Sequence, residues 1–286
     1  MSFVTCALKG GLGNQMFQIA TAAALGAEHG LDFFLMDGQF CGATTGSNPS
    51  KYYSTLYAKI PRKKLIDKGD VLEYEECKFG YVDFNEQVEF CKQNELGLVI
   101  NGYFQSERYF QKHATYIRSL FTPAEGLDKY IRNNTDLYRD YPELDPRTPD
   151  GLKRAFIGVR RGDYCRYATV HNPASMNYYN RAMAAAQADV YYIMSDDIGW
   201  CRSQFINEDG GPRYVFFEEP DDLRAFFFAR LFQTYICANS TYHWWASYLS
   251  LYPTPTVYTP KEHFGPAGPQ DYQDYFRSDM ILISGI

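Results

Sequence analysis

Short apolar runs alternate with amphipathic segments along the second half of the chain. The apolar runs are rich in β-branched and aromatic side chains and predict strands at 156–159, 190–194, 214–217, 235–238 and 256–258. The segments between them have helical spacing, at 178–188, 198–206, 221–232 and 241–251. Because helices separate these strands, the sheet should be parallel, and a ligand should bind at the carboxyl ends of its strands.

The first half of the chain begins in the same style and then becomes irregular. A strand at 4–8, a glycine-rich turn at 10–13 and an alanine-rich helix from Asn14 to His29 precede a strand at 31–36. Residues 40–95 show no clear period, which predicts loops and irregular helices. A strand at 98–103 and a helix from Ser106 to Leu120 follow.

Prolines interleaved with acidic residues mark the segment 121–150 as a connector. Pro142, Pro146 and Pro149 would resist a packed element and suit a linker between domains. A chain of 286 residues with 45% hydrophobic positions can bury two cores of medium size. We therefore expect an N-terminal α/β domain over 1–148 and a doubly wound α/β domain over 149–286. The pattern leaves open whether the last helix packs back on the N-terminal domain.

Charge and cysteine content exclude several classes of protein. The net charge is −6 and the basic residues are scattered, so the chain offers no basic stripe for a nucleic-acid backbone. The seven cysteines are an odd number without C-x-x-C pairs, which is typical of reduced thiols. No leader peptide and no membrane-spanning apolar stretch are evident. We expect a soluble, cytoplasmic chain of bacterial or viral rather than Golgi-anchored type.

The end of the strand at 156–159 carries the most informative motif. Arg160 and Arg161 place two planar guanidiniums at the carboxyl edge of the sheet, and Gly162 lets a ligand approach the backbone. This arrangement suits a pyrophosphate. The alternative is an Arg-Gly-Asp surface turn in which Asp163 pairs internally with one arginine.

Two further polar motifs follow predicted strands and should lie at the same edge. Ser195-Asp196-Asp197 could cap the next helix or accept hydrogen bonds from a ribose or a purine. Asn239-Ser240-Thr241 precedes a helix, where hydroxyls and free N–H groups can meet a phosphate. The sequence therefore predicts one anion site built from several strand ends.

The glycine-rich turn at 10–13 has a separate chemistry. It lacks the lysine of a P-loop, and Met16 stands where a dinucleotide fingerprint needs a small residue. Asn14 and Gln15 at the helix start could meet an anion or sugar hydroxyls, or could serve only in capping and packing. No D-x-D pair and no cluster with metal-ligand spacing occurs, so the arginines would have to neutralise a diphosphate without a metal.

Five motifs in order resemble those of glycosyltransferase family 11, the alpha-1,2-fucosyltransferases. They are Gly10-Gly11-Leu12-Gly13-Asn14-Gln15-Met16-Phe17, Gly102-Tyr103-Phe104-Gln105-Ser106-Glu107, Arg160-Arg161-Gly162-Asp163-Tyr164, Ser195-Asp196-Asp197 and Asn239-Ser240-Thr241-Tyr242-His243-Trp244-Trp245. The resemblance implies a GT-B-type α/β fold with two facing Rossmann-like domains and the donor site in the C-terminal domain. It also implies metal-independent, inverting transfer of fucose from GDP-fucose, without a cofactor, to a galactose-terminated glycan. One departure is Gly158, which stands where the family's arginine motif usually has histidine.

The resemblance and the strand-end argument together assign roles. Arg160 and Arg161 would stabilise the leaving diphosphate, and Asp163 would be either the base or a partner of one arginine. The expected donor-binding residues are Gly162, Asp196, Asp197, Glu218, Asn239, Ser240, Thr241, Asn14 and Gln15, and the acceptor-side residues are Gln105 and Tyr164. No metal ligand is expected. The alternatives are a non-catalytic GDP-sugar or glycan-binding protein, or a transferase with another GDP-hexose or linkage. The acceptor glycan and the oligomeric state stay open.

Overall fold

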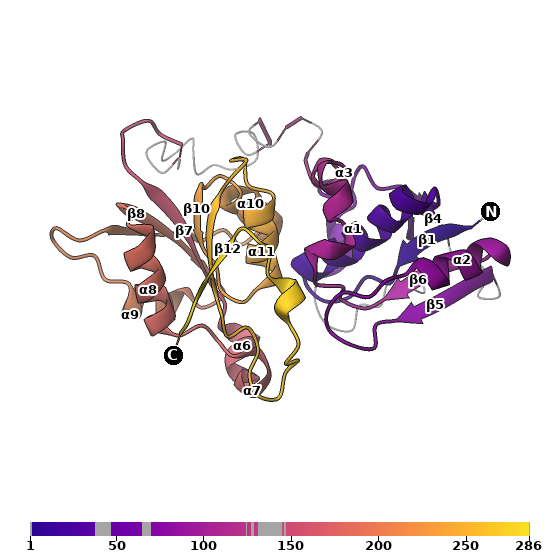
Figure 1. Ribbon diagram of the computed structural model, residues 1–286. Coiled ribbons are helices and arrows are strands. Elements are labelled where there is room, and N and C mark those ends of the chain that lie inside the picture. Colours follow the sequence, from indigo (N-terminus) through magenta and orange to yellow (C-terminus); the bar gives the residue numbers. More distant parts are fainter. Residues whose placement is uncertain are drawn as a thin grey trace. The chain divides into compact units, whose positions relative to one another are not determined.

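The computed structural model describes residues 2–37, 47–64, 70–123, 125–126, 129–130, 145 and 147–285. It divides into two α/β units. Unit 1 comprises Met1–Ala124 with Asp271–Arg277, and unit 2 comprises Glu125–Gln270 with Ser278–Ile286. Both units carry a parallel sheet, which confirms the predicted α/β class (Figure 1).

Unit 1 is built on a four-stranded parallel sheet in the order β2-β1-β6-β5. The strands are β1 (Phe3–Cys6), β2 (Asp32–Phe33), β5 (Val71–Glu75) and β6 (Gly97–Asn101), and β3 (Leu35–Met36) pairs with β4 (Arg62–Lys63). The helices are α1 (Leu12–His29), α2 (Asn85–Gln93) and α3 (Ala114–Leu120). The predicted end of this helix is confirmed, because α1 ends at His29 and Gly30 follows as its C-cap in the left-handed conformation.

The irregular stretch of unit 1 contains more regular structure than its sequence indicates. The segment 40–95 was predicted to hold loops and irregular helices, but it contains β5 and α2. The residues of β5 are half-buried or exposed, so a hydrophobic period is absent and the strand is stabilised by pairing with β6. The continuous helix predicted over 106–120 is also wrong. Two short 3₁₀ turns, Glu107–Tyr109 and Gln111–His113, precede α3.

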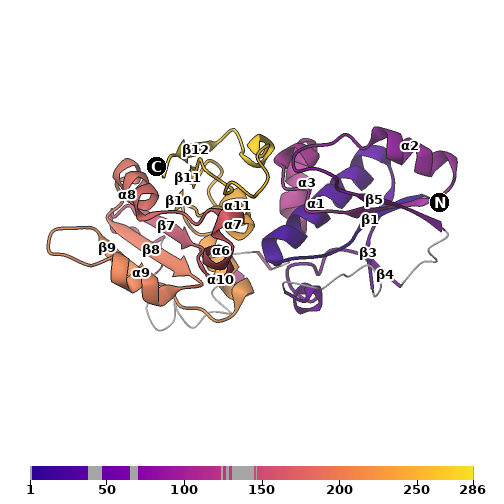
Figure 2. The ribbon, with the colours of Figure 1, turned by 90° about the horizontal axis from the view of Figure 1, so that it is seen from below.

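Unit 2 contains a six-stranded sheet in the order β12-β11-β10-β7-β8-β9, parallel throughout (Figure 2). Its strands are β7 (Arg154–Val159), β8 (Val190–Ser195), β9 (Arg213–Phe216), β10 (Thr234–Ile236), β11 (Thr256–Pro260) and β12 (Met280–Ile283). The helices are α6 (Gly162–Arg166), α7 (Ala168–His171), α8 (Met176–Ala186), α9 (Ile198–Gln204), α10 (Asp222–Ala229) and α11 (Thr241–Tyr248). This order is that of a doubly wound Rossmann fold, as predicted.

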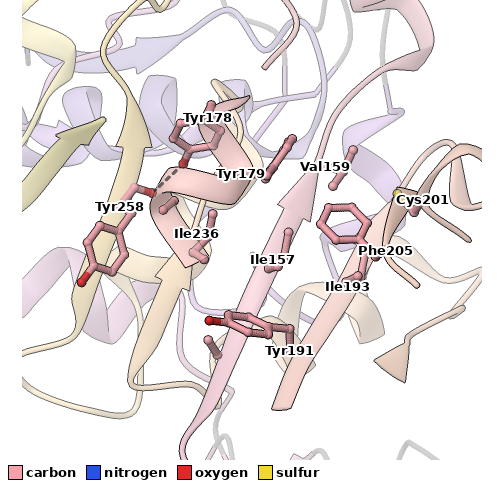
Figure 3. Close-up of a cluster of buried hydrophobic side chains, with 12 residues drawn as sticks. Ile157, Val159, Tyr178, Tyr179, Tyr191, Ile193, Cys201, Phe205, Ile236 and Tyr258 are labelled. Atoms are coloured by element: carbon pink, nitrogen blue, oxygen red, sulfur yellow. Dashed lines mark hydrogen bonds between the residues drawn. The ribbon is translucent and has the colours of Figure 1, made fainter. Parts of the chain in front are cut away.

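Alternate side chains of β7 contact different helices. Ile157 and Val159 belong to a buried cluster with residues of α8 and α9, whereas Phe156 contacts Phe232 and His243 on the α10–α11 side. Figure 3 shows the first cluster, in which the Tyr178 hydroxyl donates to the Tyr258 carbonyl at 3.2 Å. The sheet is therefore covered on both faces, and its ligand-binding edge is the carboxyl end.

The division between the units differs from the expected boundary in two respects. The structure assigns residues after Ala124 to unit 2, whereas the sequence predicts a boundary at 148/149. The two divisions disagree about 125–148 and about 271–277. Most of 125–148, including the predicted linker proline Pro142, lies outside the described residues. The boundary therefore stays a prediction. Near the C-terminus, Asp271–Arg277 belongs to unit 1, and its 3₁₀ turn Gln273–Tyr275 contacts the turn Glu107–Tyr109.

Candidate functional site

The order of strands in unit 2 gives a topological switch point at the carboxyl ends of β7 and β10. The chain proceeds from β7 outward through β8 to β9, and then crosses to β10, β11 and β12 on the other side of β7. The loops after β7 and β10 therefore depart in opposite directions, and doubly wound sheets bind their ligands at such a switch point. The loop after β7 contains the two arginines, and the loop after β10 contains Asn239 and Ser240 and leads into α11 at Thr241.

Arg160 is held between two carboxylates. Its Nη2 donates to Asp163 Oδ1 at 2.7 Å, and its Nη1 lies 3.0 Å from Asp196 Oδ2. Its guanidinium carbon also lies 5.4 Å from the centre of the Tyr164 ring. The predicted internal pair between Asp163 and one arginine therefore exists, and it lies at the carboxyl edge of the sheet where a ligand would bind. Arg160 is thus oriented by fixed partners while remaining half-exposed.

Arg161 points toward α9 and uses fewer of its donors. Its Nε donates to Asp197 Oδ2 at 3.1 Å, and its guanidinium stacks 3.9 Å from the Trp200 ring centre. Its backbone N–H donates to Asp196 Oδ1 at 2.8 Å. Among the described residues, Nη1 and Nη2 have no hydrogen-bond partner, so this guanidinium retains four N–H donors for a ligand.

Gly162 is a structural requirement for this network. A Cβ at residue 162 would lie 2.7 Å from Asp196 Oδ2, which is closer than real Cβ contacts. The glycine therefore lets Asp196 reach both arginines. It contributes to the site through this close approach, in addition to the ligand access for which it was predicted.

The imidazole of His243 lies against Gly158, the position at which the family's arginine motif usually has histidine. A Cβ at this residue would lie 2.5–2.6 Å from three atoms of the His243 imidazole. The space that a side chain on β7 would enter is thus filled by a side chain from α11. His243 is a residue of the site that sequence reasoning assigned no role, because it is 85 positions from Gly158 in the chain.

Asn239 is buried and hydrogen-bonded within the protein. Its Nδ2 donates to the backbone carbonyls of His171, Asn172 and His263. These contacts connect the loop after β10 with the loops after α7 and β11. The structure therefore gives the Nδ2 group of Asn239 a positioning role, while its Oδ1 is buried without a hydrogen-bond partner among the described residues.

The N-terminus of α11 presents the remaining part of this motif. Ser240 is the N-cap residue, but its side chain makes no capping hydrogen bond. Thr241 is the first residue of the helix and is half-buried. Hydroxyls and backbone N–H groups at this position are suited to an anion. The structure brings this helix start and the arginines to the same switch point, as the sequence predicts.

Tyr164 and Glu218 lie in different surroundings. Tyr164 stacks on His171, with ring centres 4.3 Å apart and planes 10° apart, and burial raises the pKa of its hydroxyl to about 12. Glu218 follows β9, which is separated from β7 by β8, and it pairs with Arg202 at the surface. Tyr164 therefore belongs to the cluster around Arg160, whereas Glu218 has no described contact with that cluster.

The predicted residues of unit 1 gather at the start of α1. Gln105 Nε2 donates to Asn14 Oδ1 at 2.9 Å. Gln15 is buried, and its Nε2 donates to the carbonyls of Gly10 and Ser47 at 3.0 and 2.6 Å. The Gln15 amide therefore binds the protein's own backbone, so it shapes the turn, while Asn14 and Gln105 form a joint polar surface.

Sequence reasoning missed three aromatic side chains of the site. Trp200 supports Arg161, His171 stacks on Tyr164, and His243 fills the space at Gly158. Only His243 gave a signal, because it occurs in the same motif as Ser240. Among the described residues, no group of three or more His, Cys, Asp or Glu side chains could hold a metal ion. No helix in the described parts of the chain is long and apolar enough to cross a membrane.

Comparison with known proteins places this geometry in context. Residues 151–277 match the family model of glycosyl transferase family 11, which confirms the resemblance predicted from the motifs. The O-antigen biosynthesis glycosyltransferase WbnK of Escherichia coli is 25% identical, over 90% of this chain and 93% of its own length. An alpha-1,2-colitosyltransferase of Escherichia coli is 24% identical, over 92% of this chain and 93% of its own.

Solved structures of fucosyltransferases were also found. The fucosyltransferase NodZ from Bradyrhizobium has a TM-score of 0.48 and 13% identity, covering 87% of this chain and 93% of that chain. The structure of Arabidopsis thaliana FUT1 in complex with GDP has a TM-score of 0.45 and 11% identity, covering 92% of this chain and 73% of that chain.

Proposed function

We propose, from the match of residues 151–277 to glycosyl transferase family 11, that this chain transfers L-fucose from GDP-fucose to a terminal galactose. The reaction would form an alpha-1,2 linkage with inversion at the fucosyl carbon, on an oligosaccharide or other glycan. The observation that carries the proposal is the position of Arg160 and Arg161 at the switch point of a doubly wound sheet, beside the N-terminus of α11. In unit 1, Asn14 would contribute to donor binding and its hydrogen-bond partner Gln105 to acceptor binding.

In this proposal the two arginines act on the leaving diphosphate. Arg161 would offer its Nη1 and Nη2 groups, and Arg160 would contribute positive charge from a side chain held by Asp196. The N–H groups at the start of α11 and the hydroxyls of Ser240 and Thr241 would meet other phosphate oxygens. Fixed donors of this kind stabilise charge as the fucosyl bond breaks, and they supply the role that a divalent metal has in other transferases. We therefore expect transfer without a metal or other cofactor.

Asp163 is the proposed base for the acceptor hydroxyl. It is the most exposed of the three carboxylates in the arginine network, with 47% of its side chain exposed. When a phosphate oxygen replaces it on Arg160 Nη2, its carboxylate becomes available to accept the proton that the acceptor hydroxyl loses. Asp196 and Asp197 would instead keep the guanidiniums in place, because each also receives a backbone N–H.

The proposal is tested by product formation from GDP-fucose with lactose and N-acetyllactosamine as acceptors, in EDTA. NMR of the product assigns the linkage and the anomeric configuration. Arg160→Ala and Arg161→Ala variants should each lower the rate by about two to three powers of ten, since each removes a charge donor from the leaving group. Most of the activity retained in both variants would contradict the assignment. GDP binding without transfer to a broad glycan panel would identify a non-catalytic GDP-sugar-binding protein.

A second candidate keeps the site and changes the donated sugar. One relative is named an alpha-1,2-colitosyltransferase, at nearly the same identity as the other. Contacts to a diphosphate do not distinguish the attached hexose, so the arginines serve either reaction. Competition among GDP-linked hexoses in the same assay separates the two candidates, because the preferred donor has the higher kcat/KM.

A further inference from the structure

The side chains of β7 that face α11 form a row with one gap. Phe156 and Gly158 are at alternate positions of β7 and so share a face of the sheet, and Arg160 follows two residues later, just after the strand ends. Gly158 contributes no side chain to this row. An added Cβ would lie 2.5 Å from Cε1 and 2.6 Å from both Nδ1 and Nε2 of His243. The His243 imidazole therefore lies face-on against the Gly158 backbone, between Phe156 and Arg160 in the row.

The environment of His243 is apolar on one side and charged on the other. Its side chain is buried, with 5% of the residue exposed. Its ring packs edge-to-face with the Phe156 ring, with 5.8 Å between the ring centres. Burial, followed by the nearby Arg160 charge, lowers the pKa of the imidazole to about 3, so the ring is neutral at physiological pH. A neutral ring can lie next to Arg160 without repelling it.

One nitrogen of this ring makes no hydrogen bond within the described protein. Nδ1 is buried and has no hydrogen-bond partner among the described residues. A buried polar atom without a hydrogen bond lowers the free energy of unfolding, and an apolar ring of similar shape would not have this effect. Phenylalanine is frequent in this core, as Phe156, Phe228 and Phe232 show. An imidazole at this place, directly beneath a ligand-binding arginine, is therefore better explained by the site than by packing.

We propose that His243 is a positioning residue for the diphosphate site. Its neutral imidazole, supplied by α11, takes the place beneath Arg160 that β7 leaves empty at Gly158. It fixes the position of the Arg160 side chain relative to the start of α11 at Ser240, so that both can contact the bound diphosphate. Gly158 and His243 then act as one unit, and neither can change alone. This inference rests on the proposed binding of a GDP-sugar.

The test compares variants that separate the ring's shape from its nitrogens. His243→Phe keeps an aromatic ring and loses the nitrogens, whereas His243→Ala loses both. We expect each to weaken GDP binding about tenfold in calorimetry and to lower kcat, because Arg160 and the helix start lose the polar ring that positions them. Ser247→Ala, a buried change one turn further along the same helix, is the matched control and should bind GDP like the wild type.

A swap of the ring between the two elements gives the decisive comparison. Gly158→His combined with His243→Ala returns an imidazole to the same place from β7, and it should recover most of the GDP affinity lost in His243→Ala. Gly158→Ala alone should lower the melting temperature through its clash with the ring, and the same change should be harmless in the His243→Ala background.

The outcomes separate this inference from the function on which it rests. Wild-type GDP affinity in His243→Phe, or a swap variant no better than His243→Ala, would overturn the role of His243 alone. Absence of GDP binding in the wild-type protein would overturn the proposed function as well. A wild type that binds GDP together with a weakened His243→Phe and a recovered swap supports both.

Discussion

At the residue scale, the carboxylates around Arg160 and Arg161 orient the guanidiniums and also compete with a ligand for them. Arg160 and Arg161 pair with Asp163, Asp196 and Asp197, which leaves one net negative charge before any ligand arrives. A diphosphate that binds the Nη groups of Arg160 must therefore displace a carboxylate, whereas it can reach Arg161 without doing so. Asp163 is the best candidate, because it is the most exposed and a surface ion pair stabilises by only about 0.2–1 kcal/mol.

Replacement of Asp163 should accordingly separate binding from turnover. We expect Asp163→Asn to leave GDP affinity equal to that of the wild type or about two- to fivefold tighter, since a competitor for Arg160 is weakened. The turnover number should fall by about 10²-fold, because the proposed base is lost. Calorimetry with GDP and initial rates across pH measure the two effects. Normal turnover at every pH would remove Asp163 as the base.

Asp196 should behave in the opposite way. It accepts the Arg161 backbone N–H at 2.8 Å and lies 3.0 Å from Arg160 Nη1. Hydrogen bonds to charged groups contribute about 1.5–3 kcal/mol, so Asp196→Ala should weaken GDP binding by roughly 10- to 100-fold. An unchanged affinity in this variant would show that the arginines hold their positions without it.

Buried histidines in unit 2 predict how stability depends on pH. Burial lowers the pKa of both His243 and His263 to about 3, against 6.5 for an ordinary histidine. Between these values the unfolded chain binds protons that the folded chain does not, so the free energy of unfolding falls as pH decreases below 6.5. The loss is about 1.4 kcal/mol per pH unit for each histidine. Urea unfolding at pH 4.5–7 measures this loss. His243→Phe should reduce the slope of the free energy of unfolding against pH by the contribution of one histidine, about 1.4 kcal/mol per pH unit.

The residues that could be predicted from sequence are those whose position follows from a strand end. Arg160, Asp196 and Ser240 were placed at one edge because parallel strands end at one edge. Their partners could not be foreseen in the same way. Asp196 is 35 positions from Arg161, and Trp200 gives no pattern that links it to a guanidinium. Side-chain pairing across elements requires coordinates.

At the element scale, the helices of unit 2 differ in how their N-termini are satisfied. The Asp221 side chain accepts from the backbone N–H groups of Leu223 and Arg224 at 3.0 and 2.9 Å and so caps α10. Ser240 stands at the same position of α11 and forms no such bond. An N-cap hydroxyl without a capping bond is available for a ligand, while a carboxylate with two bonds serves stability.

Alanine at these two N-cap positions should therefore give contrasting results. Asp221→Ala should lower the free energy of unfolding by about 1 kcal/mol and leave GDP affinity unchanged. Ser240→Ala should leave stability nearly unchanged and weaken GDP binding by about fivefold or more. Chemical denaturation and calorimetry on both variants measure the contrast. A loss of stability with unchanged GDP affinity in Ser240→Ala would make Ser240 an ordinary cap.

Elements with strong hydrophobic periods were predicted and the others were missed. β7, β8 and β9 agree with their predicted ranges to within two residues. β7 and β8 carry contiguous buried side chains, and β9 was predicted from its β-branched and aromatic residues although its side chains are at most half-buried. β5 and β12 were missed, because their residues are half-buried or exposed at sheet edges. The helix predicted at 106–120 failed because local turns replaced its first half. Edge strands depend on pairing, which the linear pattern does not contain.

At the scale of the whole molecule, a short C-terminal segment belongs to unit 1. Asp274 accepts the Tyr81 backbone N–H at 3.0 Å and pairs with Arg108 at 2.9 Å. These contacts fix Asp271–Arg277 within unit 1, although the strands on either side of it, β11 and β12, belong to unit 2.

Loss of these contacts should affect stability more than nucleotide binding. Asp274→Ala should lower the melting temperature by about 2–4 °C, as expected for a loss near 1 kcal/mol, and should leave GDP affinity unchanged because the proposed diphosphate site is in unit 2. Asp271→Ala, an exposed position on the same segment, is the control and should melt like the wild type. Weaker GDP binding in Asp274→Ala would show that the segment also supports the site.

The late position of Asp271–Arg277 has a consequence for synthesis on the ribosome. Domains generally fold in order as they emerge, with the N-terminal one first. Here unit 1 lacks the partner of Tyr81 and Arg108 until residue 274 has left the exit tunnel, by which time nearly all of unit 2 has been made. The first unit to be translated therefore cannot reach its final packing until almost the whole chain has been made. Nascent chains halted before residue 271 should leave unit 1 less protected from proteases than it is in the full-length chain.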